Sequence, residues 1–273
     1  MDAGSALQIE GGSFEVDGAR FTIDFAQRST ADRLFIAKPP ELVEAYARLI
    51  ERCRPQRLVE IGIFGGGSTA LLALLARPAK LVAVELDREP ITGLADLIER
   101  RGLSSSIRPY YGIDQADRVR LAALVDQELG DEPLDLVIDD ASHLLDETRS
   151  SFETLFPRLR PNGIYVIEDW PAHHRYADAA AATRATDAGV ASPPPRPRLR
   201  ELGRQLQVDD PERFQPLTRL LVQLILARAS SGEAVAEVSV DAEWITVRRG
   251  PGLLDPDTFR VTDLYTDHFG LTG

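Results

Sequence analysis

The middle of the sequence alternates continuous apolar strands with amphipathic helices, and this pattern constrains the fold more than any other feature. Five such β/α units lie between about residues 57 and 170. Strands that are apolar along their whole length are buried on both faces, which is typical of a parallel sheet covered by helices. The predicted strands are 57–63, 80–86, 107–113, 134–140 and 163–169, and the predicted helices are 40–53, 68–78, 91–102, 117–130 and 146–160. We therefore expect an α/β protein with a doubly wound, mostly parallel sheet.

The C-terminal part of the sequence predicts a change of strand direction. A helix over 216–232 is followed by strands over 234–241 and 243–250, and the short connection between them favours an antiparallel pair. With the five earlier strands they predict a seven-stranded, Rossmann-like sheet that ends in an antiparallel hairpin. The preceding stretch, over about 171–212, is rich in alanine, proline and arginine, which indicates a lid insertion.

These patterns divide the chain into three regions. Residues 1–40 hold Asp17-Gly18 between two alternating runs, so they predict an N-terminal hairpin and lid segment. Residues 41–250 are the predicted domain, with the lid insertion inside it. Residues 251–273 are a C-terminal tail.

Composition limits the location and the partners that we expect. The net charge is −12, with 43 acidic against 31 basic residues, which argues against nucleic acid as a partner because phosphate binding needs a basic face. No apolar run reaches membrane-spanning length and no secretory signal is visible at the start, so we expect a cytoplasmic protein with no membrane partner. The one cysteine, Cys53, excludes an internal disulfide and a cysteine-rich metal site. The composition neither favours nor excludes a homo-oligomer.

A glycine-rich loop, in the stretch VEIGIFGGGST, joins the first predicted strand of the sheet to its helix. A P-loop would fit Gly62 and Gly67, but Ser68 stands where the phosphate-binding lysine is required. A dinucleotide fingerprint fails because Phe64 occupies its second glycine position. A third interpretation uses Glu60, the acid two residues before Gly62.

On these residues the chain resembles the class I S-adenosylmethionine-dependent methyltransferases. Glu60, Gly62 and Gly66 match the first motif of that family, which holds the methionine end of the cofactor, and Ser68 follows in the same loop. Glu85 ends the second predicted strand, where the family carries the acid that binds the ribose hydroxyls. A carboxylate that accepts two hydroxyl hydrogen bonds is chemically suited to that role.

A further element of the resemblance follows the third predicted strand. Asp114, with Gln115 beside it, occupies the place of the acid near the adenine amine. The antiparallel ending of the sheet also suits this family. The resemblance covers about 40–250 and implies S-adenosyl-L-methionine as the cofactor, with Gln115 among the residues that bind it.

Acidic residues end the fourth and fifth predicted strands, at the edge where ligands bind in open α/β sheets. Because side chains alternate along a strand, only one of Asp139 and Asp140 should face the site, and we expect a structural role for Asp139. Asp140, Glu168 and Asp169 would then repel one another unless a cation joins them. Oxygen ligands favour Mg²⁺, with Mn²⁺ or Ca²⁺ as alternatives.

The same acids, with a histidine, are similar to a narrower family. Asp140 and His143 form an Asp-x-x-His motif, and Glu168-Asp169 follows it, as in the metal-dependent macrolide-sugar O-methyltransferases of the mycinamicin type. The catechol-methylating enzymes are also similar but carry a lysine where His143 stands. This resemblance implies a magnesium-dependent enzyme that methylates a hydroxyl of a small molecule, with a sugar on a natural product as the expected acceptor. It also implies that His143 is the general base. An imidazole, with an ordinary pKa near 6.5, can accept a proton that a cation has loosened.

Two other functions are compatible with the sequence. One is a metal-independent methyltransferase for nitrogen or carbon acceptors, in which the acids are structural. The other is a partner subunit that binds the cofactor without transferring methyl. Just past the fifth strand, His173 and His174 are interpreted as solvated loop residues, and Trp170 either lines the acceptor pocket or packs under the lid.

Overall fold

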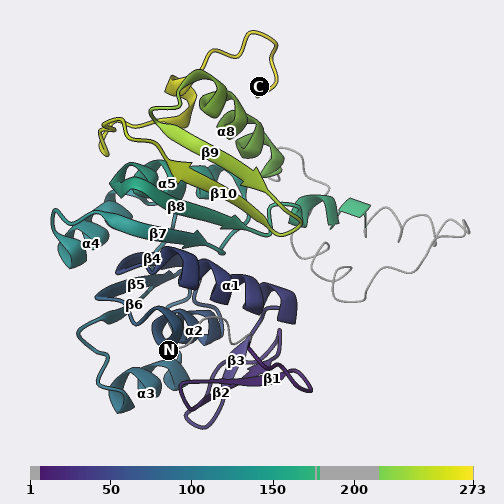
Figure 1. Cartoon of the computed structure of the whole chain (residues 1–273), viewed down its shortest axis with the longest axis vertical. Helices are drawn as coiled ribbons and strands as arrows, with labels where there is room; N and C mark the ends of the chain where they lie inside the picture. The colour runs from purple at the N-terminus through teal and green to yellow at the C-terminus, as the bar shows by residue number, and fades with distance from the viewer. Residues whose placement is uncertain (1–6, 176, 179–214, 273) are drawn as a thin grey trace, which may run out of the picture.

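The computed structural model, shown in Figure 1, describes residues 7–175, 177–178 and 215–272. Seven strands form its central sheet: β4 (Arg57–Ile61), β5 (Lys80–Glu85), β6 (Ile107–Tyr111), β7 (Leu134–Asp139), β8 (Leu159–Glu168), β9 (Val235–Val240) and β10 (Trp244–Arg249). Their spatial order is β6-β5-β4-β7-β8-β10-β9. Strands β4 to β8 are parallel, whereas β10 is antiparallel to both β8 and β9. The predicted fold class is confirmed.

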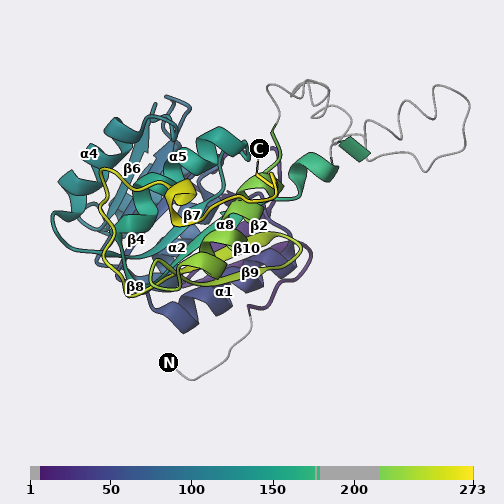
Figure 2. The same ribbon diagram turned by 90° about the horizontal axis from the view of Figure 1, so that it is seen from above.

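Helices cover both faces of this sheet. They are α1 (Pro40–Cys53), α2 (Gly67–Ala76), α3 (Thr92–Arg100), α4 (Arg118–Leu129), α5 (Leu145–Leu155) and α8 (Thr218–Ser230), with short 3₁₀ turns η1 (Phe156–Arg158) and η2 (Val261–Leu264). One core cluster joins the sheet to α1, α2 and α3, and the other joins it to α4, α5 and α8. Figure 2 shows α1 on one side of the sheet and α4 and α5 on the other. Neighbouring strand residues such as Leu58 and Val59 enter opposite clusters, as the pleat requires.

A second, three-stranded sheet precedes the main one. Strands β1 (Ser13–Val16) and β2 (Ala19–Ile23) form the predicted hairpin, and Asp17 and Gly18 take positive φ at its turn. The sequence did not predict β3 (Leu34–Ile36), which pairs parallel with β2. Because β3 packs beside α2, the segment around it lies against the glycine-rich loop.

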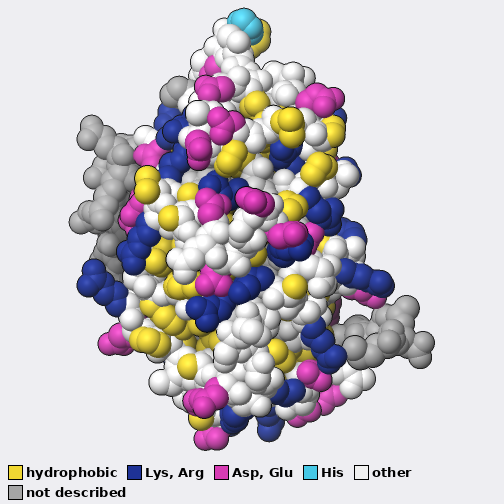
Figure 3. All heavy atoms as spheres, turned by 90° about the vertical axis from the view of Figure 1, so that its left-hand side faces the viewer, with side chains coloured by type: hydrophobic (Ala, Val, Ile, Leu, Met, Phe, Trp, Pro, Cys, Tyr) yellow, Lys and Arg dark blue, Asp and Glu magenta, His cyan; other side chains and the backbone are white. Residues whose placement is uncertain are grey.

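The predicted lid insertion over 171–212 falls almost entirely outside the described residues. Within the described part, no helix is both long and apolar enough to cross a membrane. On the face seen in Figure 3, basic and acidic side chains are interspersed, without a broad basic surface.

Candidate active site

The predicted site residues gather at one edge of the main sheet. Strands β4, β5, β7 and β8 are parallel, so their carboxyl ends meet at this edge. The order of the strands reverses between β4 and β7. Glycine-loop residues therefore lie on one side of the reversal and the acids of β7 and β8 on the other.

Two glycines of the loop are required because other backbone lies against them. Gly62 has φ +96°, and a Cβ there would stand 2.3 Å from the backbone oxygen of Asp140. At Gly67, a Cβ would stand 2.1 Å from the backbone oxygen of Phe35, just before α1. The glycine pattern thus lets the loop after β7 and the N-terminal segment approach β4 and α2 closely. Gly66, the third matched glycine, has φ +82° at the start of α2.

Glu60 lies beneath this loop and is 1% exposed. The Thr69 hydroxyl donates a hydrogen bond of 2.5 Å to its carboxylate, and the Ser68 hydroxyl donates another. Burial raises the pKa of Glu60 to about 7, and these hydroxyls only partly oppose that shift. The folded protein therefore binds a proton at Glu60 more tightly than an unfolded chain does.

This shift predicts how stability depends on pH when no cofactor is present. Below the ordinary Glu pKa near 4.5 the side chain is neutral in both states, and between 4.5 and about 7 only the folded state keeps its proton. The contribution of Glu60 to the free energy of unfolding should fall by about 3 kcal/mol as pH rises through that window. Glu60→Gln should reduce the wild-type fall by about that amount, as measured by urea unfolding at pH 4.5 and pH 8, and the fall due to Asp139, whose pKa is also raised, should stay. A matched surface variant, Glu44→Gln, should keep the wild-type pH dependence.

Glu85 ends β5 beside the same loop. Its Oε2 accepts hydrogen bonds from the amides of Ile63 (2.9 Å) and Phe64 (2.7 Å), and its Oε1 accepts one from Asp87 (3.1 Å). Two apolar side chains flank this carboxylate and are exposed, Phe64 by 51% and Leu86 by 68%. An acid between exposed apolar groups suits a ligand with a polar sugar and an aromatic base.

Asp114 and Gln115, the two residues predicted to lie near adenine, have different surroundings from each other. Asp114 accepts a hydrogen bond from the amide of Ala116 and stays exposed. Gln115 is buried, and it donates from Nε2 to Asp139 (3.3 Å) and accepts at Oε1 from the amide of Ser142 (3.0 Å). Both ends of Gln115 are thus used inside the protein, and its contact with the cofactor stays a prediction.

Asp139 and Asp140 point to different surroundings. Asp139 is 2% exposed and accepts hydrogen bonds from Ser151 (2.5 Å) and Tyr165 (3.0 Å), while burial raises its pKa to about 6. Asp140 instead faces His143, whose Nε2 lies 4.0 Å from its Oδ1. The two carboxylates are separated in the way that strand alternation requires.

Asp140, His143 and Asp169 form the group of side chains with metal-binding geometry. One ligand atom from each lies within 4.8 Å of the others. His143 and Asp169 both adopt positive φ, at 56° and 51°, a conformation that is uncommon for residues other than glycine. Burial raises the pKa of Asp169, and the imidazole of His143 opposes that shift. Two carboxylates and an imidazole are a donor set that divalent cations accept.

Glu168, the third predicted metal ligand, lies outside this group. It is 1% exposed, and its Oε2 accepts a hydrogen bond of 2.9 Å from Lys38 while its Oε1 accepts one from the Tyr46 hydroxyl. Burial raises the pKa of Glu168 and the Lys38 charge opposes it. Burial alone would lower the pKa of Lys38, but Asp140 and Glu168 outweigh it and the net shift is upward. In this arrangement the Lys38 ammonium lies against the Glu168 carboxylate, and the role of Glu168 as a metal ligand stays a prediction.

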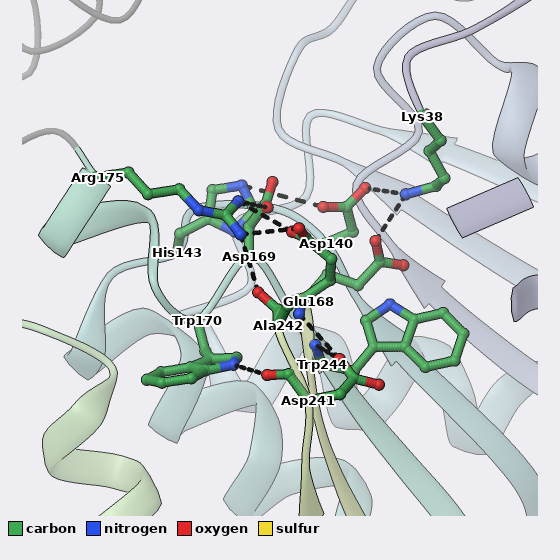
Figure 4. A network of polar contacts seen from close by, with 11 residues as sticks. Lys38, Asp140, His143, Glu168, Asp169, Trp170, Arg175, Asp241, Ala242 and Trp244 are labelled. Atoms are coloured by element: carbon green, nitrogen blue, oxygen red, sulfur yellow. Dashed lines mark hydrogen bonds and ion pairs between the residues drawn. The ribbon is translucent and has the colours of Figure 1, made fainter. Parts of the chain in front are cut away.

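Three residues of the acid cluster were missed from the sequence: Lys38, Tyr46 and Arg175. Figure 4 shows Lys38 and Arg175 approaching the acids from opposite sides. Arg175 lies 3.5 Å from Asp169 and 2.8 Å from Glu243. One feature of the sequence could have drawn attention to Lys38: it is one of only two lysines among 31 basic residues.

The residues after β8 correct one expectation. His173 was interpreted as a solvated loop residue, but it is 8% exposed, and burial lowers its pKa to about 4. His174 does remain exposed and lies 2.7 Å from the Thr218 hydroxyl. Trp170 donates a hydrogen bond of 2.9 Å to the backbone oxygen of Asp241, which ties the end of β8 to the β9–β10 turn.

Comparison with known proteins defines the class of this fold and site. A family model described as a methyltransferase domain matches residues 59–170. The glycine loop, Glu85, Asp140, His143, Glu168 and Asp169 all lie within that match. Over these residues the chain matches a methyltransferase domain, as its motifs predicted.

Individual relatives are similar over shorter stretches. The chain is 48% identical over 64 residues to 8-demethyl-8-alpha-L-rhamnosyl tetracenomycin-C 2'-O-methyltransferase of Streptomyces olivaceus, covering 22% of this chain and 16% of that protein. It is 34% identical over 150 residues to the 8-demethyl-8-(2-methoxy-alpha-L-rhamnosyl)-tetracenomycin-C 3'-O-methyltransferase of the same organism, covering 51% and 34%. The aligned parts are thus about a third or less of each relative's length.

The fold is also similar to that of a solved structure, the MycE methyltransferase from the mycinamycin biosynthetic pathway in complex with Mg and SAH. The TM-score is 0.50 at 23% identity, and the match covers 82% of this chain and 50% of MycE. The chain therefore spans about half the length of this structural neighbour.

Proposed function

We propose that this chain is a cation-dependent, S-adenosylmethionine-dependent O-methyltransferase that acts on a sugar hydroxyl of a natural product. The observation that carries the proposal is the grouping of Asp140, His143 and Asp169 within ligand distance of one another. This group lies next to the glycine loop, because the backbone of Asp140 contacts Gly62. The loop that would hold the methyl donor and the acid–imidazole group therefore lie at the same edge of the sheet.

The residues at this edge fit both predicted cofactors. Glu60, Gly62, Gly66 and Ser68 would surround the methionine end of S-adenosylmethionine, and Glu85 would accept hydrogen bonds from the ribose. Asp140 and Asp169 would hold the divalent cation, for which Mg²⁺ is our first choice. When bound, S-adenosylmethionine supplies an electrophilic methyl group, and a divalent cation lowers the pKa of a hydroxyl.

The side chains of the protein contribute positioning and proton transfer. His143 would accept the proton of the acceptor hydroxyl, since its ring is 23% exposed at the site and lies beside Asp140. Acceptors with two neighbouring oxygens should be preferred, because both oxygens can bind one cation.

The similarity to named enzymes supports the acceptor class. Two of them are named for methylating the 2' or 3' position of rhamnosyl tetracenomycin derivatives, and MycE was solved with Mg and SAH. A panel of rhamnosylated aromatic polyketides and macrolide glycosides, incubated with S-adenosylmethionine and Mg²⁺, tests the proposal by mass spectrometry. We expect one added methyl group on the sugar, and none in EDTA. Full transfer in EDTA would favour the metal-independent enzyme, and cofactor binding without transfer to any acceptor would favour a partner subunit.

Glu85→Ala tests the cofactor half of the site. Loss of a charged acceptor should weaken S-adenosylmethionine binding by roughly 1–3 kcal/mol, measured by titration calorimetry. Glu89→Ala is the matched control, because Glu89 is an exposed acid four residues away whose ion pair with Arg28 spans 3.6 Å. Unchanged affinity in the Glu85 variant would remove this residue from the cofactor site.

A further inference from the structure

The backbone of His143 has an uncommon conformation in the turn between β7 and α5. Its φ is +56°, and such a conformation persists in a residue other than glycine only where the surroundings fix it. Two hydrogen bonds hold the turn on either side of it. The Ser142 amide donates to Oε1 of Gln115 at 3.0 Å, and the Leu144 amide donates to Oγ of Ser142 at 3.2 Å. The first of these bonds comes from a distant part of the chain, because Gln115 lies 27 residues before Ser142.

The side chain of Gln115 is itself held by buried groups. It is 6% exposed, and its Nε2 donates to Oδ1 of Asp139 and to Oγ of Ser151, both at 3.3 Å. Asp139 in turn accepts hydrogen bonds from Ser151 and Tyr165 at its other oxygen, Oδ2. One orientation of the Gln115 amide fits these neighbours, because the Ser142 amide needs an acceptor and the Asp139 carboxylate needs a donor. The buried groups therefore fix the oxygen that holds the turn.

We propose that Gln115 is a positioning residue that holds the turn between β7 and α5 so that the imidazole of His143 reaches the acceptor hydroxyl. This role rests on the proposed function, in which His143 accepts the proton of that hydroxyl. Gln115 acts through the main chain of Ser142, and the next residue carries the imidazole. A general base must stand within hydrogen-bond reach of the proton that it accepts. A turn that is free to relax should therefore slow proton transfer.

Gln115→Met keeps an unbranched side chain of similar length and removes the amide. Hydrogen exchange at the Ser142 amide, followed by NMR, should become roughly tenfold faster or more, because this N–H loses its acceptor inside the protein. Turnover at saturating S-adenosylmethionine should fall roughly tenfold or more, since catalysis is sensitive to small displacements of a reacting group. In the His143→Ala background the same substitution should change turnover by less than about threefold, because no imidazole is left to misplace.

Gln223 offers a matched control. It is a buried glutamine of α8, 3% exposed, and its Oε1 has no hydrogen-bond partner among the described residues. Gln223→Met removes the same chemical group from the interior. Exchange at Ser142 and turnover should both stay within about twofold of wild type, since the two sites are independent.

An exchange of donor and acceptor between Gln115 and Asp139 tests the contact a second way. Gln115→Glu alone places two carboxylates together, so the side chain should move away and turnover should fall. Adding Asp139→Asn supplies an amide donor toward position 115, while its oxygen can accept from Ser151 and Tyr165, which both bind Oδ2 in the wild type. The carboxylate at position 115 can then accept from the Ser142 amide again. The double variant should return exchange at Ser142 and turnover to within about threefold of wild type.

The outcomes separate this role from the proposed function. Faster exchange at Ser142 together with a turnover loss that disappears in the His143→Ala background supports the positioning role. If Gln115→Met does not fold, recovery of turnover and exchange in the double variant supports it, and a folded double variant without recovery overturns it. Unchanged exchange in both single variants overturns the role of Gln115, as does an equal turnover loss with and without His143. Exchange needs no acceptor, so it decides the Gln115 contact even if no acceptor is methylated, a result that would overturn the proposed function.

Discussion

Asp140→Ala is expected to abolish methyl transfer while leaving S-adenosylmethionine affinity within about threefold of wild type. Asp140 is the acid that faces both His143 and Lys38, so its loss removes a cation ligand and the partner of the imidazole together. A cation that stabilises developing charge contributes several kcal/mol, so turnover should fall by roughly three orders of magnitude. EDTA should reproduce this loss in the wild type, and added Mg²⁺ should reverse it only there.

Turnover should be measured at saturating cofactor, and the affinity for S-adenosylmethionine should be measured by calorimetry on the same protein samples. Asp146→Ala is the control, because Asp146 is an exposed acid in the next helix that pairs with Arg149 at 2.6 Å. An Asp140→Ala enzyme that keeps full turnover in EDTA would leave the acid cluster with a structural role alone.

His143→Ala should lose roughly 10²- to 10⁴-fold in turnover, the usual contribution of a general base. The imidazole accepts a proton only when it is neutral, so wild-type turnover should fall toward acidic pH and this fall should be absent in the variant. Raising the pH should partly restore the variant, because hydroxide can then remove the proton. Cofactor affinity should not change.

A role of His143 as a metal ligand can be distinguished by measurement from its proposed role as a general base. Its ring lies within ligand distance of Asp140 and Asp169, so Mn²⁺ affinity must be measured beside turnover. Affinity within threefold of wild type identifies a base, whereas a parallel loss of affinity would identify a metal ligand. His174→Ala, which removes an exposed imidazole bonded to Thr218, is the control and should keep both.

The sheet could be predicted from sequence because its signals are local. Each apolar run encodes its own strand, and the two acids at the end of β7 could be assigned to opposite faces by alternation alone. The short strand β3 was missed because three residues carry no period. Its place depends on packing against α2 and pairing with β2.

The acid cluster was only half predictable for a related reason. Acids and histidine at strand ends follow from motif spacing, but the Lys38 contacts to Asp140 and Glu168 join residues 102 and 130 positions apart. Spacing carries no information about such contacts. The sequence argument for a metal ion at the three acids did not include Lys38, a cation that the protein itself supplies, and the metal ion stays a prediction.

Because Gly62 has no side chain, the glycine loop and the loop after β7 lie in backbone contact. In the proposed enzyme this contact would set the distance between the cofactor and the acid–imidazole group. Here the backbone just after β4 meets the backbone of Asp140 with no room for a methyl group, so any larger residue at Gly62 would push the glycine loop and the loop after β7 apart. Methyl transfer needs the reacting atoms about 3–3.5 Å apart and in line. In the proposed enzyme the main chain would therefore hold donor and acceptor at one spacing, which a change of acceptor-binding side chains elsewhere would leave as it is.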